Sequence, residues 1–387
     1  MDLKGSFPVE QFKQIETPFY FYDTNLLRQT LQIIRKESSK YGYHIHYAVK
    51  ANANSKLLSI IRENGLGADC VSGGEIRAAL KAGFPSDKIV FAGVGKADWE
   101  INLGLDHDIF CFNAESAAEL EVINELAGLK GKIARVALRV NPEVDAHTHH
   151  YITTGLKENK FGINLSQLES VVDALQSMKN IELIGLHFHI GSQITDLTAF
   201  QGLCSRVEEI QRSLEQRRIT LQVINFGGGL GIDYHHPNHN PIPDFEGYFR
   251  IFNKHFKARP NQEVHFEPGR SVVGQCGSLI TKVLYVKEGA SKRFAIVDAG
   301  FTELIRPALY QAFHKIENLS SEAPVSEYDV VGPICESSDS FGKAIGLNEV
   351  KRGDCFALRS AGAYGEIMAS QYNCRTLPKA YFSEDFL

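Results

Sequence analysis

The sequence predicts an α/β fold: a (β/α)8 barrel of the TIM type, followed by a C-terminal β-domain that the N-terminal strand completes. Eight short apolar runs alternate with amphipathic stretches over about 250 residues, which is the usual size of such a barrel. Polar and glycine residues directly follow these runs, and barrel active sites are built at such strand ends. A doubly wound sheet would show the same alternation, so the polar strand ends are what favour the barrel.

The expected barrel strands are short runs rich in β-branched and aromatic residues. They are Tyr43–Val49, Ala68–Val71, Ile89–Ala92, Asp108–Phe112, Arg135–Val140, Ile184–His189, Val223–Phe226 and Val264–Glu267. The helical patterns between them include Glu115–Ala127, Gln167–Met178, Leu197–Gln216 and Phe245–Phe256. Asn113 stands before Ala114-Glu115-Ser116, so we expect it to cap the helix that follows.

After about residue 270 the expected strands no longer alternate with helices. They are Leu279–Val286, Phe294–Val297, Tyr328–Val331 and Cys355–Leu358. The aromatic run Phe19–Tyr22 also has strand character, and we expect it to join this group. The predicted domains are therefore a barrel of residues 25–270 and a β-domain formed by residues 1–24 and 271–387.

Composition argues against several classes of function. The formal net charge of −5 gives no basic surface of the kind that a nucleic-acid-binding protein needs. No apolar stretch approaches the ~18 residues of a membrane span, and the N-terminus lacks the apolar core of a secretory signal. The seven cysteines, without a Cys-x-x-Cys pair, fit reduced thiols. We therefore expect a cytoplasmic protein that binds neither nucleic acid nor membrane.

Lys50 stands where the first predicted strand gives way to a loop. A lysine amine at the mouth of a core is partly desolvated and can lose its proton, as a nucleophilic or Schiff-base lysine requires. Most lysines in such positions are solvated loop residues, so Lys50 alone is a weak signal. The rest of the chain supplies, in order, the other parts of a pyridoxal phosphate site.

Two further segments suit that coenzyme. Gly227-Gly228-Gly229 follows the seventh predicted strand, and successive glycines let backbone N–H groups approach a phosphate. Ile232 stands where a dinucleotide-binding fingerprint needs glycine or alanine, so the segment is not such a fingerprint. A tight turn would also explain the three glycines. Glu267 ends the eighth predicted strand, where a carboxylate would keep a pyridine nitrogen protonated. The alternative is an ion pair between Glu267 and Arg270.

Histidines at two places raise the question of a metal. His187 and His189 share one face of the sixth predicted strand, and His-x-His is a metal-binding pattern. Metal-dependent barrel hydrolases place such a pair on the first strand, whereas the other strand ends here offer lysine, asparagine and glycine. We therefore expect no metal: His189 suits contact with a flat coenzyme ring, and His187 suits the core. His235, His236 and His239 are interpreted as a solvated loop.

The last third of the chain carries groups that suit a substrate. Arg270 and Arg306 can each bind a carboxylate as a bidentate fork, and Glu336 can bind an ammonium group. Such a set would suit a small molecule that is zwitterionic at its far end. Cys335 could donate a proton, although a lone cysteine is more often an inert core residue.

With these segments the chain resembles the barrel-type (fold type III) pyridoxal phosphate decarboxylases, and among them those that act on meso-2,6-diaminopimelate. The matching segments run in the family's order through nearly the whole chain. They are Tyr47-Ala48-Val49-Lys50-Ala51-Asn52, Lys160-Phe161-Gly162, His189-Ile190-Gly191-Ser192-Gln193, Gly227–Gly229, Glu267–Arg270, Arg306-Pro307-Ala308-Leu309-Tyr310, Gly332–Ser337 and Gly362-Ala363-Tyr364. Ser338, where the family usually has glycine, and the segment Ser340-Phe341-Gly342-Lys343 depart from the pattern.

The resemblance implies pyridoxal 5′-phosphate as the cofactor and a set of residues that bind it. Lys50 would hold its aldehyde as an imine, and His189 would stack on its ring. The phosphate would be bound by Ser192, Gly228 and Gly229, the ring nitrogen by Glu267, and further contacts would come from Asp69, Gly269, Arg270 and Tyr364.

The resemblance also implies the reaction, the decarboxylation of meso-2,6-diaminopimelate to L-lysine and CO2. The substrate would be held by Arg270, Arg306, Tyr310, Tyr364 and Glu336. Cys335 would be the proton donor, contributed by the partner chain of a head-to-tail homodimer with shared active sites.

Other functions stay open at this stage. A decarboxylase of ornithine or carboxynorspermidine would not need both Arg306 and Glu336, because those substrates lack a second amino-acid head. A racemase would need an acid–base pair on both faces of the α-carbon. A non-catalytic regulatory homologue that binds pyridoxal phosphate would be expected to lose the proton donor or the phosphate contacts, and both are present here.

Overall fold

The protein is described from a computed structural model, which describes residues 7–144 and 160–386. The chain divides into two compact units. The first comprises Leu31–Gly231 and Asp244–Gly269. The second comprises Met1–Thr30, Ile232–Pro243 and Arg270–Leu387.

The first unit is a closed barrel of parallel strands, which confirms the predicted fold class. Its strands pair in the order β2-β3-β4-β5-β6-β8-β9-β10, and β10 pairs with β2 to close the ring. A short strand, β7, pairs with the end of β6. The bounds are β2 (His44–Ala48), β3 (Gly67–Cys70), β4 (Ile89–Phe91), β5 (Cys111–Ala114), β6 (Ala134–Asn141), β7 (Ile163–Asn164), β8 (Ile181–His187), β9 (Val223–Asn225) and β10 (Glu263–Phe266).

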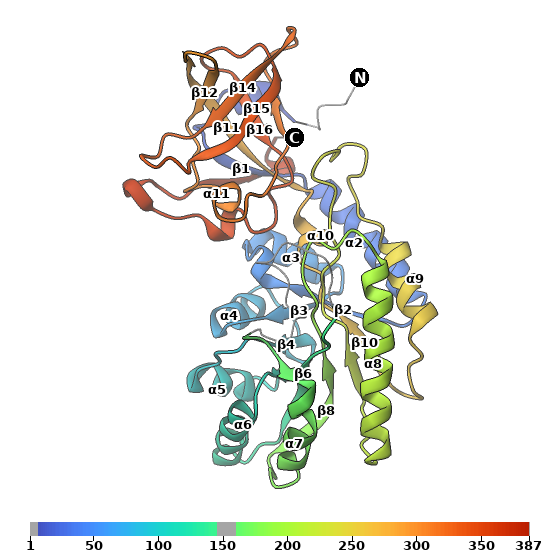
Figure 1. The fold of residues 1–387 in the computed structure, drawn as a ribbon. Coiled ribbons are helices and arrows are strands. Elements are labelled where there is room, and N and C mark those ends of the chain that lie inside the picture. Colours follow the sequence, from blue (N-terminus) through green and yellow to red (C-terminus); the bar gives the residue numbers. More distant parts are fainter. Residues whose placement is uncertain (1–6, 145–159, 387) are drawn as a thin grey trace. The chain divides into compact units, whose positions relative to one another are not determined.

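Helices surround this ring of strands (Figure 1). They are α3 (Ser55–Glu63), α4 (Gly73–Lys81), α5 (Asp98–Asp106), α6 (Ala117–Leu129), α7 (Leu165–Leu175), α8 (Thr198–Gln216) and α9 (Phe245–His255), with α2 (Thr24–Ser39) on the chain segment that leads into the barrel. Among the described helices, none combines the length and the apolar character needed to cross a membrane.

The expected helix cap at Asn113 is wrong. Asn113 lies inside β5 with its side chain buried. The cap of α6 is Ser116, whose hydroxyl accepts a hydrogen bond from the Glu119 N–H at 3.2 Å. Because the strand continues to Ala114, Asn113 cannot adopt the cap position. Its side-chain amide lies in the barrel interior instead.

Alternation along the strands separates the core from the barrel interior. Phe226 and Phe266 point outward and pack on Phe252 of α9, with ring centroids 4.7 Å apart in both pairs. The side chains of Asn225 and Glu267 point the other way and meet inside the barrel. The period of two that a strand imposes therefore places the polar groups at the ends of β9 and β10 inside the ring.

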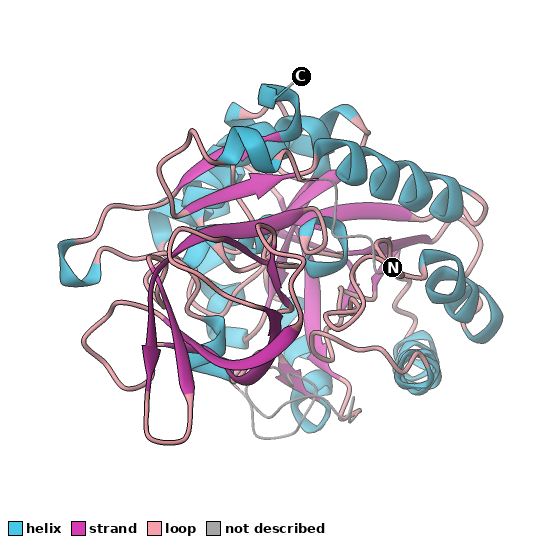
Figure 2. Ribbon diagram, turned by 90° about the horizontal axis from the view of Figure 1, so that it is seen from above, coloured by secondary structure: helices cyan, strands magenta, loops and turns pink. Residues whose placement is uncertain are grey.

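The second unit is built on a mixed sheet with the order β13-β16-β11-β12-β14-β15. Its longest strand, β11, has 12 residues, and curved strands are visible in the view from above (Figure 2). β1 pairs antiparallel with β11 and parallel with β17, so the predicted N-terminal strand does complete this sheet. The bounds are β1 (Phe19–Tyr22), β11 (Gly277–Glu288), β12 (Arg293–Val297), β13 (Ile316–Asn318), β14 (Val325–Val331), β15 (Ser340–Asn348), β16 (Cys355–Leu358) and β17 (Lys379–Phe382), with the short helices α1 (Val9–Phe12), α10 (Arg270–Val273) and α11 (Arg306–Tyr310).

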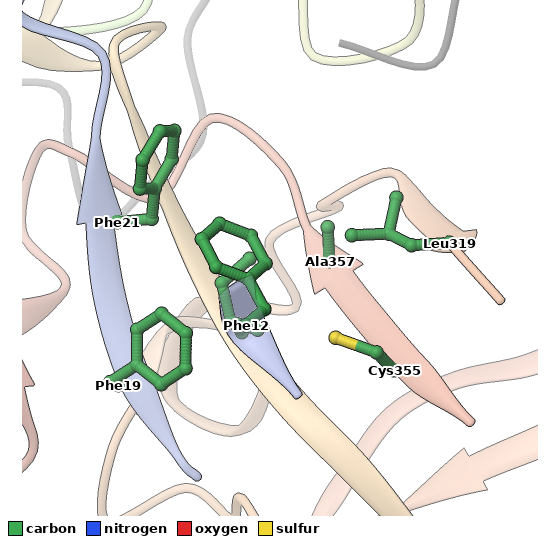
Figure 3. Close-up of a cluster of buried hydrophobic side chains, with 7 residues drawn as sticks. Phe12, Phe19, Phe21, Leu319, Cys355 and Ala357 are labelled. Atoms are coloured by element: carbon green, nitrogen blue, oxygen red, sulfur yellow. The ribbon is translucent and has the colours of Figure 1, made fainter. Parts of the chain in front are cut away.

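An aromatic cluster joins the N-terminal segment to this sheet (Figure 3). The Phe12 ring lies 5.2 Å from that of Phe19 and 5.1 Å from that of Phe21, both in edge-on contact. Leu319 and Cys355 pack on the other side of Phe12. Burial raises the pKa of Cys355 to about 12, so this thiol serves packing.

Candidate active site

Lys50 lies at the carboxyl end of β2, in a short 3-10 turn over Val49–Ala51. It is half-buried, between the buried residues Val49 and Ala51. The Ala48 N–H donates to the Pro268 carbonyl at 3.1 Å, which ties this end of β2 to the residues that follow β10. The structure thus places Lys50 and Glu267 at the ends of neighbouring strands, which the chain order alone did not require.

Glu267 is a buried carboxylate that three side chains hold inside the barrel. His187 Nε2 lies 2.8 Å from one carboxylate oxygen. The amides of Asn225 and Asn113 donate to the other oxygen at 2.7 Å and 3.3 Å. Burial raises the pKa of Glu267, but His187 and, after it, His46 and Lys50 together outweigh burial and bring that pKa to about 2. Glu267 is therefore ionised at neutral pH, which is the state that a protonated ring nitrogen would require.

A second carboxyl group, Asp69 of β3, lies in the same interior. It is buried, and its Oδ1 has no hydrogen-bond partner within the described residues. Burial and the neighbouring Glu267 raise the pKa of Asp69 well above its usual value, although Lys50 acts in the opposite direction. The two carboxyl groups at this end of the barrel thus have pKa values shifted in opposite directions, and Asp69 Oδ1 has no hydrogen-bond partner among the described residues.

His189 is held by the glycine segment. Its Nδ1 accepts a hydrogen bond from the Gly228 N–H at 3.3 Å. Burial, and then the positive charge of Lys50, lower the pKa of His189 well below its usual value, so the ring is neutral. The hydrogen bond from Gly228 fixes one edge of the neutral imidazole ring, so its flat face suits contact with a planar group.

The loops after β8 and β9 run side by side. The Ile194 N–H donates to the Gly229 carbonyl, and the Gly231 N–H donates to the Ile194 carbonyl, both at 2.9 Å. This pairing brings the segment that carries Ser192, a half-buried residue, alongside the glycines.

The glycines in this loop have no room for a side chain. A Cβ on Gly227 would lie 2.1 Å from the Phe188 carbonyl oxygen, and one on Gly228 would lie 2.2 Å from the Glu267 carbonyl oxygen. Gly229 has φ near +115°, which a side chain disfavours. The backbone is therefore bare along the loop, as a phosphate-binding loop needs to be.

In the second unit, two buried arginines share one phenol oxygen. Arg270 Nη1 donates to the Tyr234 hydroxyl oxygen at 2.6 Å, and Arg306 Nη1 donates to it at 2.8 Å. Burial raises the pKa of Tyr234, but the two guanidinium groups together outweigh burial and lower it. Tyr234 thus holds two positive charges close together, and a pair of buried cations attracts a carboxylate.

The surroundings of this cluster fix the arginines further. His314 Nδ1 lies 2.9 Å from the Arg359 carbonyl and donates to it, so Nε2 accepts from Arg306 at 3.2 Å. The Arg270 guanidinium lies 4.9 Å from the Tyr364 ring centroid. Tyr310 is half-buried at the end of α11. The second unit therefore brings together four of the predicted substrate residues: Arg270, Arg306, Tyr310 and Tyr364.

Cys335 and Glu336 occupy an exposed loop between β14 and β15. Buried Asp339 anchors the loop, since its carboxylate accepts from the Ile334 N–H at 2.8 Å and from the Phe301 N–H at 2.7 Å. Glu336 accepts a hydrogen bond from the Tyr372 hydroxyl at 2.8 Å. The expectation that a lone cysteine is more often core does not hold for Cys335, which is open to solvent.

Comparison with known proteins decides the family. Residues 26–274 match the family described as pyridoxal-dependent decarboxylase, pyridoxal binding domain. The diaminopimelate decarboxylase of Bacteroides thetaiotaomicron is 66% identical over 386 residues, which is 100% of both chains. The chain belongs to the diaminopimelate decarboxylase family. It is a pyridoxal-dependent decarboxylase, as the resemblance implied.

Two further diaminopimelate decarboxylases agree, and a more distant structure shows the same fold. That of Aquifex aeolicus is 42% identical over 93% of this chain and 84% of its own. The crystal structure of the Helicobacter pylori diaminopimelate decarboxylase complexed with L-lysine is 40% identical, with a TM-score of 0.92 over 97% of this chain and 94% of that one. The lysine decarboxylase of Selenomonas ruminantium, 21% identical, shares the fold with a TM-score of 0.86.

The residues of this diaminopimelate decarboxylase family member fit pyridoxal phosphate. Ionised Glu267 suits the protonated ring nitrogen, and the bare glycine loop suits the phosphate. The unpartnered Asp69 Oδ1 is a buried polar atom that a bound molecule could satisfy.

Sequence reasoning missed several residues that hold these groups. His187 is buried, as expected, yet it is the main partner of Glu267. Asn225 carried a usable signal, because it ends a strand just before the glycines, but Tyr234 and Asp339 carried none. The three loop histidines interpreted as solvated are all exposed, as expected: His235, His236 and His239.

Proposed function

We propose that this enzyme decarboxylates meso-2,6-diaminopimelate to L-lysine and CO2, the last step of lysine biosynthesis through diaminopimelate. The observation that supports it most is the position of Lys50 and ionised Glu267 just after the carboxyl ends of the paired strands β2 and β10. The identity of 66% to a diaminopimelate decarboxylase over the full length supports the substrate. We further propose that the protein is cytoplasmic.

The barrel residues would hold the coenzyme. When bound, pyridoxal phosphate supplies an electron sink for the electron pair that departing CO2 leaves behind. In our proposal Lys50 attaches it through the ε-nitrogen, His189 covers one ring face, and Glu267 keeps a proton on the ring nitrogen. The phosphate would be held by Ser192 and the N–H groups of Gly228 and Gly229, and the remaining contacts would come from Asp69, Gly269, Arg270 and Tyr364.

The residues of the second unit would select the substrate. Arg270 and Arg306 would bind its distal carboxylate, with Tyr234 positioning both guanidinium groups. Glu336 would bind the distal ammonium group. Tyr310 and Tyr364 would complete these contacts. Two buried arginines suit a substrate that carries a distal carboxylate, and ornithine has none, which disfavours ornithine.

Cys335 would return a proton to the α-carbon. Both Cys335 and Glu336 are exposed in the single chain, which supports a role in the site of a partner subunit. We therefore propose a head-to-tail homodimer with shared active sites, in which each chain lends this loop to the other. The anchoring of the loop by Asp339 supports this role, because a donated loop needs a fixed shape.

Replacing Lys50 tests the proposal. The variant Lys50→Ala should lose both the visible absorbance of the bound coenzyme and CO2 release from meso-diaminopimelate, whereas Lys36→Ala, on the exposed face of α2, should keep both. Retained steady-state turnover in Lys50→Ala would refute the role of Lys50. A larger kcat/KM for ornithine or lysine than for meso-diaminopimelate would refute the substrate.

A further inference from the structure

Three polar side chains gather at the amino-terminal ends of the two strands that close the barrel. His265 of β10 lies opposite His44 of β2 in the strand register, and their ring centroids are 4.7 Å apart. Together with Glu263 they offer one ligand atom each within 4.8 Å of one another. This cluster lies at the opposite end of the strands from Lys50 and Glu267, and the proposed reaction does not use it.

The hydrogen atoms on the neighbouring histidine can be assigned from its partners. His46 Nδ1 lies 3.1 Å from the Lys88 carbonyl oxygen, which only accepts, so Nδ1 carries a hydrogen. The His46 ring is buried and neither nitrogen contacts a carboxylate, so the neutral form is favoured. His46 Nε2 therefore carries a lone pair, and His265 Nδ1, 2.8 Å away, donates to it.

The contact between His265 Nε2 and Glu263 Oε2 then requires a bridging cation, either a proton or a metal ion. His265 Nε2 lies 3.0 Å from Glu263 Oε2, while the Nδ1 hydrogen of the same ring is already donated to His46. Two acceptors at that distance repel each other unless a cation lies between them. His44 adds a third ligand atom to this group. A proton bridging His265 and Glu263 would involve only two atoms, whereas a metal ion would use all three.

We propose that His44, Glu263 and His265 bind a divalent transition-metal ion of the zinc class. Two imidazoles and one carboxylate suit zinc, and they leave a fourth position for water. The chain from His265 through His46 to the Lys88 carbonyl matches the way that metal-binding histidines donate their second N–H to a fixed acceptor.

The ion would have a structural task. β2 and β10 are joined in register by two residue pairs only, His265 with His44 and Phe266 with Ile45. A metal bound to one side chain of β2 and two of β10 would fasten the closure of the barrel. Arg135 acts electrostatically on Glu263, so one positive charge is already close and we expect moderate rather than extreme affinity.

Zinc binding to the holoenzyme tests the site. Competition with a chromophoric chelator should show one Zn²⁺ per chain, and His44→Asn and Glu263→Gln should each weaken it by about 10-fold or more. Both side chains are exposed, so the barrel should fold without them. Zn²⁺ should raise the thermal unfolding midpoint of the wild type but not of the two variants, and decarboxylation should be unchanged in all three.

Two matched variants locate the ion. Glu182→Gln removes an exposed carboxylate at the start of β8, and His236→Asn removes an exposed histidine of the loop after β9; neither should weaken binding. The proposal is overturned if no Zn²⁺ binds, which would mean that a proton fills the gap between His265 and Glu263. It is equally overturned if binding survives both His44→Asn and Glu263→Gln, or is lost in His236→Asn.

Discussion

His187 Nε2 lies 2.8 Å from Glu267 Oε2, and both side chains are buried inside the barrel. The pair is assembled from β8 and from the end of β10, with Asn225 of β9 between them also bound to Glu267. The barrel thus ionises Glu267 with its own side chains, before any coenzyme or substrate is present. A charge that is already in place costs no reorganisation when the reaction begins.

Neutralising Glu267 should therefore impair chemistry more than coenzyme binding. We expect Glu267→Gln to lower kcat by about 100-fold or more, in the range found when one preorganised electrostatic group is removed. The visible spectrum should still show bound coenzyme. Glu267→Asp, which keeps the charge, should recover part of the rate, and an unchanged kcat in Glu267→Gln would contradict this role.

Removing the Tyr234 hydroxyl should loosen the two arginines. Tyr234→Phe deletes the oxygen that accepts from Arg270 and Arg306, and a hydrogen bond to a charged group contributes about 1.5–3 kcal/mol. We expect KM for meso-diaminopimelate to rise about 10-fold or more, with a smaller change in kcat.

Tyr248→Phe is the matched control for that variant. Tyr248 is also buried, but its hydroxyl has no hydrogen-bond partner in the part of the chain that the structure describes. Its removal should leave KM nearly unchanged. Equal effects of the two replacements on KM would show that Tyr234 acts through packing alone.

A methyl group in the glycine loop should weaken coenzyme binding. In Gly228→Ala the new Cβ would lie 2.2 Å from the Glu267 carbonyl oxygen, so the backbone has to shift. At the usual cost of overpacking, about 1–3 kcal/mol, coenzyme affinity should fall about 10-fold or more. Gly95→Ala, where the Cβ would meet nothing within 4 Å, is the control, and fluorescence titration of the apoenzyme measures both.

His314 should make stability depend on pH. Burial and then Arg306 lower the pKa of His314 from 6.5 to about 3. Between these values the unfolded chain binds a proton that the folded chain does not, so stability falls as pH falls through this range, by up to about 1.4 kcal/mol per pH unit. Urea unfolding of His314→Gln at pH 7, 6 and 5 should show a shallower loss than the wild type. Parallel profiles would contradict the assignment.

Mixing two inactive variants should restore activity if the sites are shared. In an equimolar mixture of Lys50→Ala and Cys335→Ala chains, half of the dimers carry one intact site, so we expect about one quarter of the wild-type activity. Each variant alone should be nearly inactive. If both are inactive alone and the re-associated mixture stays inactive, Cys335 serves its own chain's site and the proposed sharing is wrong.

The residues that local pattern identifies are those whose position depends on their own strand. Lys50, the glycines 227–229 and Glu267 each end an apolar run, and parallel barrel strands bring such ends to one rim. The wrong prediction of a helix cap at Asn113 shows where local pattern fails. The strand β5 continues two residues beyond its apolar run, so Asn113 is part of the strand and not of the helix cap.

By itself, the sequence determined the barrel, its added β-domain and the order of the strand-end groups, since period and turn residues are local properties. Only the tertiary structure decided which of these groups meet: His187 with Glu267, Tyr234 with two arginines, and His44 with Glu263 and His265. Such pairs join elements that are far apart in the chain. Their distances are set by barrel closure, strand register and side-chain packing, and no single segment contains that information.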